Sequence, residues 1–217
     1  MMSLTETDSL IILIDENSHN AFQKTTMNIQ NIIRAAISDA QAEQINIVND
    51  KRKLHRERSK RFVECLSIRL REACAEYDSV ASLSKHHNDD RDKFGMNELL
   101  FDVTVVQYGS ICSGKSRKKL TFIKKGLWAV ESEFARNKRE ALFDFNKLVL
   151  ADSENKLFVG PRNSQESDYR RVLGEAARNC AGNVYVALIP HPDQWPEKGA
   201  KDIVVWMWKS TDWEMIS

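Results

Sequence analysis

The sequence predicts an α/β fold in which a mixed β-sheet is flanked by helices and preceded by a helical N-terminal region. Three observations lead to this prediction. Apolar residues recur at helical spacing through residues 21–85. A polar, charged stretch at residues 86–93 then marks a boundary, and beyond it strand patterns alternate with helical ones. We therefore divide the chain into a helical region, residues 1–93, and an α/β core, residues 94–217.

The N-terminal region is expected to hold two helices. The short apolar run at residues 10–14 fits either a strand or the entry to a helix. Residues 21–50 predict the first helix, and residues 51–85 predict a second helix or a continuation of the first. The apolar stripes that predict them are Ile29, Ile32, Ile33, Ala36, Ile37 and Ala40 in the first, and Val63, Leu66, Leu70, Ala73, Tyr77 and Val80 in the second.

The core is expected to follow the order β-β-α-β-α-β-β. We predict strands at residues 99–108 and 127–134, a helix at 136–151, a strand at 156–159, a helix at 167–181, and strands at 184–189 and 203–208. Gly182 is suited to end the second of these helices, because glycine readily adopts the left-handed conformation of a C-cap. Residues 110–119 are small, polar and basic, which predicts a loop.

Composition narrows the class of protein. The net charge of +1 does not by itself favour a nucleic-acid partner, so such a partner has to be argued from local patches. The four cysteines form no C-x-x-C pair, which argues against a zinc knuckle and for reduced thiols. The apolar run at 10–14 is too short for a signal peptide or a spanning helix. We therefore expect a cytoplasmic protein with no membrane partner.

Acidic residues on two neighbouring predicted strands are the main candidate for chemistry. Asp102 interrupts an otherwise apolar strand, and Glu131 and Glu133 lie two residues apart on the next strand. Because side chains alternate along a strand, Glu131 and Glu133 share one face. Converging carboxylates suit a hard divalent ion, which can polarise a phosphodiester and activate water. The alternative is that these residues only line a solvated sheet face.

The run Leu-Trp-Ala-Val-Glu-Ser-Glu-Phe at residues 127–134, with the helix and strand patterns after it, resembles the core of PD-(D/E)XK restriction-endonuclease-like proteins. The resemblance covers about residues 94–190. It implies that Asp102 is the motif aspartate, that Glu131 is the first acid of the following pair, and that Mg²⁺ or Mn²⁺ is the cofactor. It also implies cleavage of DNA, with restriction or phage defence as the setting and a homodimer or partner subunit as a further expectation.

The sequence departs from the family at Glu133, which stands where lysine is usual. Glu133 would then be a third ligand or would orient the water. Two other residues enter through the same resemblance, Glu98 as a further metal ligand and Lys147 as an accessory catalytic cation. The departure also leaves open a non-catalytic protein of the same fold that binds nucleic acid or a partner enzyme.

Two basic segments are candidates for contact with phosphate groups. Residues 51–61 contain seven lysines or arginines, which also fit the solvated face of a long helix. Residues 115–125 connect the two acidic strands, so we expect them near the metal. The nucleic-acid contacts predicted in this second segment are Lys115, Arg117, Lys118, Lys119, Lys124 and Lys125.

A competing motif runs from Gly109 to Ser116 and fits the phosphate-binding P-loop pattern G-x-x-x-x-G-K-[ST]. It follows a predicted strand, and the P-loop mechanism requires a helix directly after it. A P-loop nucleotide-binding protein is therefore the alternative function. The ligand-type residues at 86–90 fit an ordinary polar loop.

Overall fold

The computed structural model describes residues 16–43, 45, 50–87, 89–114, 117–135 and 137–216, with side chains described from Ile29 onward except that of Glu197. The run at residues 10–14 lies outside the described residues. Within them, the chain forms an α/β fold built on one seven-stranded mixed sheet. This confirms the predicted fold class.

The strands follow one another across the sheet in chain order. Strand β3 is parallel to β4, and β4 to β5, whereas all other neighbours are antiparallel. The parallel pairs are connected by helices, as parallel neighbours require. The strands are β1 (Val80–Ser84), β2 (Val103–Cys112), β3 (Lys119–Ser132), β4 (Ser153–Pro161), β5 (Asn183–Ile189), β6 (Val204–Lys209) and β7 (Asp212–Ile216).

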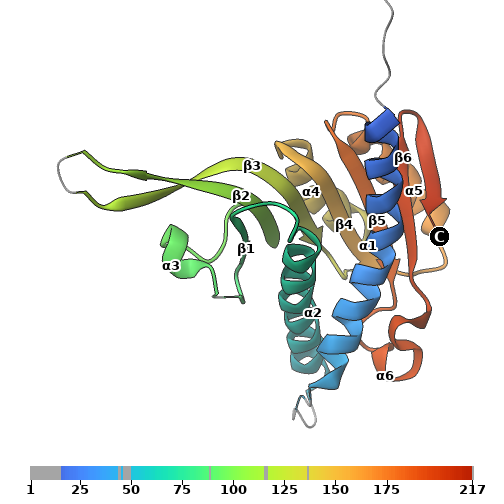
Figure 1. Ribbon diagram of the computed structural model, residues 1–217. Coiled ribbons are helices and arrows are strands. Elements are labelled where there is room, and N and C mark those ends of the chain that lie inside the picture. Colours follow the sequence, from blue (N-terminus) through green and yellow to red (C-terminus); the bar gives the residue numbers. More distant parts are fainter. Residues whose placement is uncertain are drawn as a thin grey trace, which may run out of the picture.

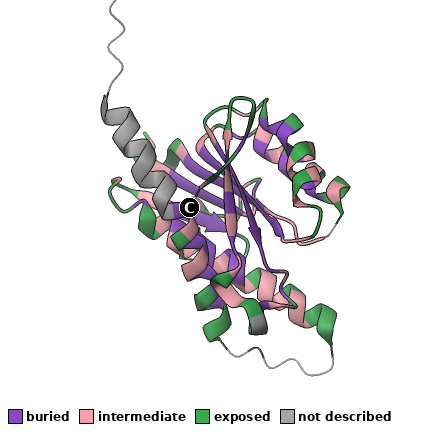
Figure 2. Cartoon of the chain, turned by 90° about the vertical axis from the view of Figure 1, so that its right-hand side faces the viewer, coloured by how far each residue is buried: buried purple, intermediate pink, exposed green. Residues whose placement is uncertain are grey.

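Helices cover both faces of the sheet (Figure 1). Helices α1 (Glu16–Ala42) and α2 (Lys51–Ala73) pack on one face, where they share a core with Val130 and Trp128 of β3. Helices α4 (Lys138–Val149) and α5 (Glu166–Ala177) pack on the other face, against Ala129 and Phe158. Figure 2 shows the buried residues running along the strands between these helices. The short elements are α3 (Arg91–Phe94), α6 (Trp195–Lys198) and the 3-10 turn η1 (Gly199–Lys201).

Most predicted elements of the core are present, with boundaries shifted by a few residues. The predicted order β-β-α-β-α-β-β appears as β2, β3, α4, β4, α5, β5 and β6. Gly182 has φ 74°, so it adopts the left-handed conformation predicted for it. Strand β7 was not predicted. It pairs with β6 across a tight turn in which Ser210 has φ 59°, and that conformation carries no glycine signal in the sequence.

The helix predicted over residues 51–85 is wrong beyond Ala73. Residues 80–84 instead form β1, which pairs with β2 from Val80 opposite Gln107 to Ser84 opposite Val103. Pairing with the long neighbouring strand β2 makes residues 80–84 a strand instead of a helix. Local spacing alone does not distinguish a short buried strand from a helical turn. Since β1 belongs to the common sheet and α1 and α2 share its core, the N-terminal region packs as part of the same body.

Strand β3 begins eight residues earlier than predicted, at Lys119, and with β2 it forms a long hairpin. Register shifts between Val105 and Val106 and between Gln107 and Tyr108 interrupt the pairing. Such bulges bend and twist a strand pair. The hairpin projects beyond the rest of the sheet (Figure 1).

Within the described part of the chain, no helix is both long enough and apolar enough to cross a bilayer.

Candidate functional site

Asp102 and Glu131 lie on adjacent strand ends at the open end of the β2–β3 hairpin. Asp102 directly precedes β2, and Val103 of β2 is paired with Val130 of β3. The backbone N–H of Ser132 donates to Asp102 Oδ2 over 2.9 Å, and the Ser132 hydroxyl donates to the same oxygen over 2.7 Å. These two bonds fix the Asp102 carboxylate against β3. Oδ1 takes part in neither of them.

Glu131 is a buried acid on the face that α4 covers. Its neighbour Val130 belongs to the core on the opposite face, so strand alternation turns Glu131 toward α4. The residue is only 1% exposed, and its Oε1 atom has no hydrogen-bond partner. Burial, followed by the charge of Asp102, raises the pKa of Glu131 to about 7, although Lys147 acts in the opposite direction. A buried carboxylate beside a second carboxylate favours the approach of a cation.

Lys147 supplies positive charge to this site from the last turn of α4. Its ammonium lies 3.0 Å from Glu131 Oε2 and 2.8 Å from Asp144 Oδ1, one helical turn earlier. Partial burial lowers the pKa of Lys147, but the bonds to Asp144 and Glu131 outweigh this, so the pKa is raised overall. Lys147 therefore stays protonated and connects the helix to the end of β3.

Glu133 lies beyond the end of β3 and faces a different set of neighbours. Its Oε1 accepts a hydrogen bond of 2.5 Å from the backbone N–H of Ala135. Burial raises the pKa of Glu133, the bond from Ala135 opposes this, and the carboxyl of Asp144 raises it further. The hydroxyl of Tyr169 on α5 is buried without a hydrogen-bond partner, and the pKa of Tyr169 is raised by burial and then by Glu133. Glu133, Asp144 and Tyr169 thus extend the cluster of interacting ionisable side chains along α4 and α5.

The predicted residues are only partly brought together. Asp102, Glu131 and Lys147 interact directly or through their charges, and Glu133 reaches the same site through Asp144. Glu98 lies on the exposed loop before β2, where its charge acts on His86. No group of three acidic, histidine or cysteine side chains among the described residues has the geometry of a metal site. Asp102 and Glu131 are the pair that could hold a divalent ion, because Oε1 of Glu131 is a buried carboxylate oxygen without a hydrogen-bond partner.

Sequence reasoning did not identify Ser132, Asp144 or Tyr169. A signal for Asp144 was present, since it lies three residues before Lys147 and flanks the buried stripe of α4, which consists of Ala141, Phe145 and Leu148. Side chains at this spacing meet on one helical face. Ser132 carried no comparable signal, because its role depends on Asp102, 30 residues away in the chain.

The prediction that the basic segment at 115–125 lies near the metal is wrong. Asp102 precedes the first residue of β2, whereas this segment turns back along β2 only as far as Gln107. Its paired residues therefore lie from roughly 17 Å, at Lys125, to roughly 30 Å, at Lys119, from Asp102. Lys125 forms an ion pair with Glu154 at the base of the hairpin. Arg117, Lys118, Lys119 and Lys124 are exposed farther along it, and Lys115 lies outside the described residues.

The P-loop alternative is also wrong. Gly109 and the three residues after it continue β2, and the chain resumes as β3 at Lys119. The required helix is therefore replaced by a strand paired back onto β2, with Ile111 opposite Leu120. Lys115 and Ser116 lie outside the described residues. A phosphate-binding helix N-terminus cannot form where the chain is a hairpin.

The first turns of α2 lie at the sheet edge where β3 and β5 end. The rings of His55 and His191 are 5.5 Å apart, and those of His191 and Phe134 are 6.5 Å apart. Phe134 directly follows Glu133, so the start of α2 approaches this edge from the face opposite α4. The exposed cations carried there are Lys51, Arg52, Lys53 and Arg56.

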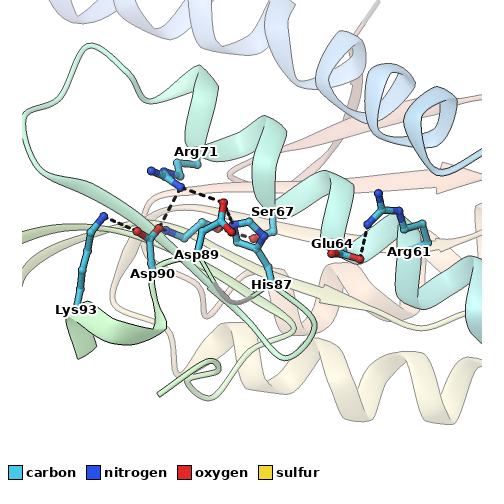
Figure 3. A network of polar contacts seen from close by, with 9 residues as sticks. Arg61, Glu64, Ser67, Arg71, His87, Asp89, Asp90 and Lys93 are labelled. Atoms are coloured by element: carbon cyan, nitrogen blue, oxygen red, sulfur yellow. Dashed lines mark hydrogen bonds and ion pairs between the residues drawn. The ribbon is translucent and has the colours of Figure 1, made fainter. Parts of the chain in front are cut away.

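Asp90, in the polar segment before α3, has a structural role (Figure 3). Asp90 is 1% exposed and accepts a 2.9 Å hydrogen bond from the backbone N–H of Ser82 in β1. This oxygen, Oδ2, also lies 3.4 Å from the Arg71 guanidinium, and Lys93 donates to Oδ1 over 2.5 Å. Asp90 therefore holds the edge strand and α2 together.

No protein-family model, no curated protein and no solved structure matches the chain significantly.

Proposed function

We propose that this protein is a metal-dependent endonuclease that hydrolyses phosphodiester bonds in DNA at the site formed by Asp102, Glu131 and Lys147. One observation carries the proposal. Two carboxylates from adjacent strand ends come together, and one of them is buried with an unpaired oxygen and a raised pKa. A divalent ion would satisfy that oxygen and offset the repulsion between the carboxylates.

The residues have separate tasks in this proposal. Asp102 and Glu131 would hold Mg²⁺ or Mn²⁺, which when bound would polarise the phosphodiester and favour ionisation of the attacking water. Ser132 holds Asp102 in position through two hydrogen bonds to Oδ2. Lys147 favours the ionised form of Glu131 against the effects of burial and Asp102, and it would offer positive charge close to the phosphate.

The order of these residues supports the family resemblance. An aspartate precedes one strand, a Glu-x-Glu pair ends the next, and a helix with a parallel strand follows. The lysine usual at the position of Glu133 has a counterpart of the same charge in Lys147, which contacts Glu131 from α4. DNA cleavage in the cytoplasm, in restriction or phage defence, is the setting that we propose with it.

The second candidate is a non-catalytic nucleic-acid or partner-binding protein. It is favoured by the fact that Lys147 already pairs with Glu131, while Glu133 accepts a bond from the backbone and faces Asp144. In that case the buried ion pair would only fix α4 to the sheet.

The test is cleavage of plasmid and single-stranded DNA by the wild-type protein and Glu131→Gln, with Mg²⁺ or Mn²⁺. Glu175→Gln, an exposed acid on α5, is the matched control. We expect metal-dependent cleavage by the wild type and the control, and at least a hundredfold loss in Glu131→Gln. Cleavage that survives in Glu131→Gln would place the chemistry elsewhere. A protein that binds DNA but never cleaves it would support the second candidate.

A further inference from the structure

The outer part of the β2–β3 hairpin stands apart from the rest of the sheet. We call it the arm and define it as residues 107–112 of β2 and 119–125 of β3. The pairing of β1 with β2 ends at Gln107, and the pairing of β4 with β3 begins at Gly126. Beyond these points, among the described residues, the two strands pair with each other, and the backbone N–H of Tyr108 also donates to the Ser79 carbonyl over 2.9 Å. At the base of the arm, Phe94 of α3 contacts Tyr108, with their rings 5.7 Å apart. Farther out, both faces of the arm carry exposed side chains (Figure 1).

The arm is positively charged without any compensating acid of its own. Residues 103–126 contain no aspartate or glutamate. Lys119 and Lys124 are exposed on the arm, and Arg117 is exposed just beyond it. Lys125, at the base, is paired with Glu154 of β4. This charge would bind a polyanion and would repel a second arm of the same kind.

The arm also exposes an apolar stripe on one face. Ile111 lies opposite Leu120 in the register, and Phe122 lies opposite Gly109, so all three apolar side chains share this face. They are 61%, 50% and 45% exposed, respectively. The ring of Phe122 lies over Gly109, where a Cβ atom would come within 2.7 Å of it. The glycine thus makes room for an aromatic side chain that the arm presents to solvent.

The cations of the arm are distributed over both faces. Lys119 lies opposite Cys112, one residue out of phase with the apolar stripe, and so points to the other face. Lys124 lies in the second bulge, and its side chain reaches the space above Gly109 on the apolar face. A partner that contacts only one face, such as a membrane surface, would leave one of these lysines unused.

We propose that the arm is a double-stranded DNA-binding ribbon that enters the groove of a duplex. The major groove admits a two-stranded β-ribbon, and phosphates line both of its sides. With each face of the ribbon turned toward one backbone, Lys119 would contact one of them and Lys124 the other, and Ile111, Leu120 and Phe122 would lie against the sugars on the side of Lys124. The arm ends roughly 30 Å from Asp102, close to one turn of a duplex, about 34 Å. The choice of DNA rests on the proposed function, and the ribbon in the groove goes beyond it.

The experiment measures binding of a labelled 30-base-pair duplex in EDTA, so that no cleavage takes place. The arm variants are the double substitution Lys119→Glu with Lys124→Glu, and separately Phe122→Ser. The control is Lys201→Glu, an exposed lysine outside the arm. We expect the double variant to bind at least tenfold more weakly at 0.1 M salt. The slope of log affinity against log salt should fall by about two, since each lost phosphate contact removes about 0.9.

Three results would overturn the proposal. One is duplex affinity within twofold of the wild type in the double variant, with thermal unfolding unchanged. Another is an equal loss of affinity for a single strand of the same length, because a single strand has no groove. The third is intact duplex binding together with loss of self-association or of binding to phosphatidylglycerol vesicles, which would assign the stripe to another partner.

The proposed function is judged by a different measurement. Hydrolysis with Mn²⁺ by the wild type and Glu131→Gln tests the chemistry, whereas binding in EDTA tests the arm. A protein that binds duplex through the arm but hydrolyses nothing would contradict the proposed function and still support the arm as a DNA-binding ribbon.

Discussion

The ammonium of Lys147 lies 3.0 Å from the buried carboxylate of Glu131 and joins the last turn of α4 to the end of β3. The two partners differ in exposure, because the Lys147 side chain is 43% exposed and that of Glu131 only 2%. Loss of the lysine therefore leaves a charge in the interior, whereas loss of the glutamate leaves a lysine that can reach water. The two halves of the pair should respond differently to substitution.

Substitution of Lys147 by methionine should destabilise the fold. Breaking a buried pair costs about 3–5 kcal/mol, and because Lys147 is partly exposed we expect about 1–2 kcal/mol at pH 7.5. Urea denaturation measures this. Lys138→Met is the matched control, since Lys138 begins the same helix and pairs with Asp168 on a more exposed surface. Equal losses in the two variants would mean that Glu131 is not held by Lys147.

The stability of the protein should fall as pH rises between about 4.5 and about 7. The pKa of Glu131 is raised from 4.5 to about 7 by burial and then by Asp102, so the folded state binds this proton more tightly than the unfolded chain. Stability therefore decreases with pH across this window, by up to about 3 kcal/mol. In Glu131→Gln this part of the slope should disappear. The check is the free energy of unfolding at pH 5 and pH 7.5 for both proteins, and parallel slopes would contradict it.

Binding of Mn²⁺ should release protons. If Asp102 and Glu131 hold the ion, Glu131 must ionise, and close to its pKa of about 7 a substantial fraction is protonated beforehand. Titration calorimetry at pH 6.5 in buffers of different ionisation enthalpy should give a release of about half a proton or more. Asp102→Asn and Glu131→Gln should both weaken binding at least tenfold. Binding that is unchanged in both variants would remove the metal from this site.

Ser132 should act as a positioning residue for Asp102. Ser132→Ala removes the 2.7 Å bond from the hydroxyl and leaves the backbone bond of 2.9 Å, at a cost of about 1 kcal/mol in stability. We expect DNA cleavage to fall about tenfold, with partial rescue in Ser132→Thr, which restores a hydroxyl. Kinetics and urea denaturation of the three proteins separate positioning from stability. Failure of Ser132→Thr to recover activity would argue that only packing is affected.

The start of α2 should contribute to DNA binding. Lys53 and Arg56 are exposed there, and His55 connects the helix to His191 at the edge where β3 ends. Lys53→Glu with Arg56→Glu should weaken duplex binding in EDTA about tenfold and reduce its salt dependence. Lys201→Glu again serves as the control. An affinity equal to that of the control would leave residues 51–61 as the solvated face of a helix.

The spacing of apolar residues along the chain predicted which faces of several helices and strands are buried. Alternation along β3 placed Glu131 on the face opposite Trp128 and Val130, and the structure has this arrangement. The helical spacing of Ile29, Ile33 and Leu66 likewise identified residues that are buried. Burial of apolar side chains is a local constraint on which face of an element turns inward, so it can be derived from a short window of sequence.

Pairing between distant segments of the chain decided which charged and polar side chains became neighbours. Asp102 meets Ser132 across 30 residues because β2 and β3 pair as a long hairpin, and the same pairing carries Lys119, opposite Cys112, roughly 30 Å away from Asp102. The partner of Glu131 came from α4, whose docking depends on the whole core. Strand register and hairpin length are set by contacts between distant segments, so the sequence by itself determined the faces of the elements, and only the fold determined which charges became neighbours.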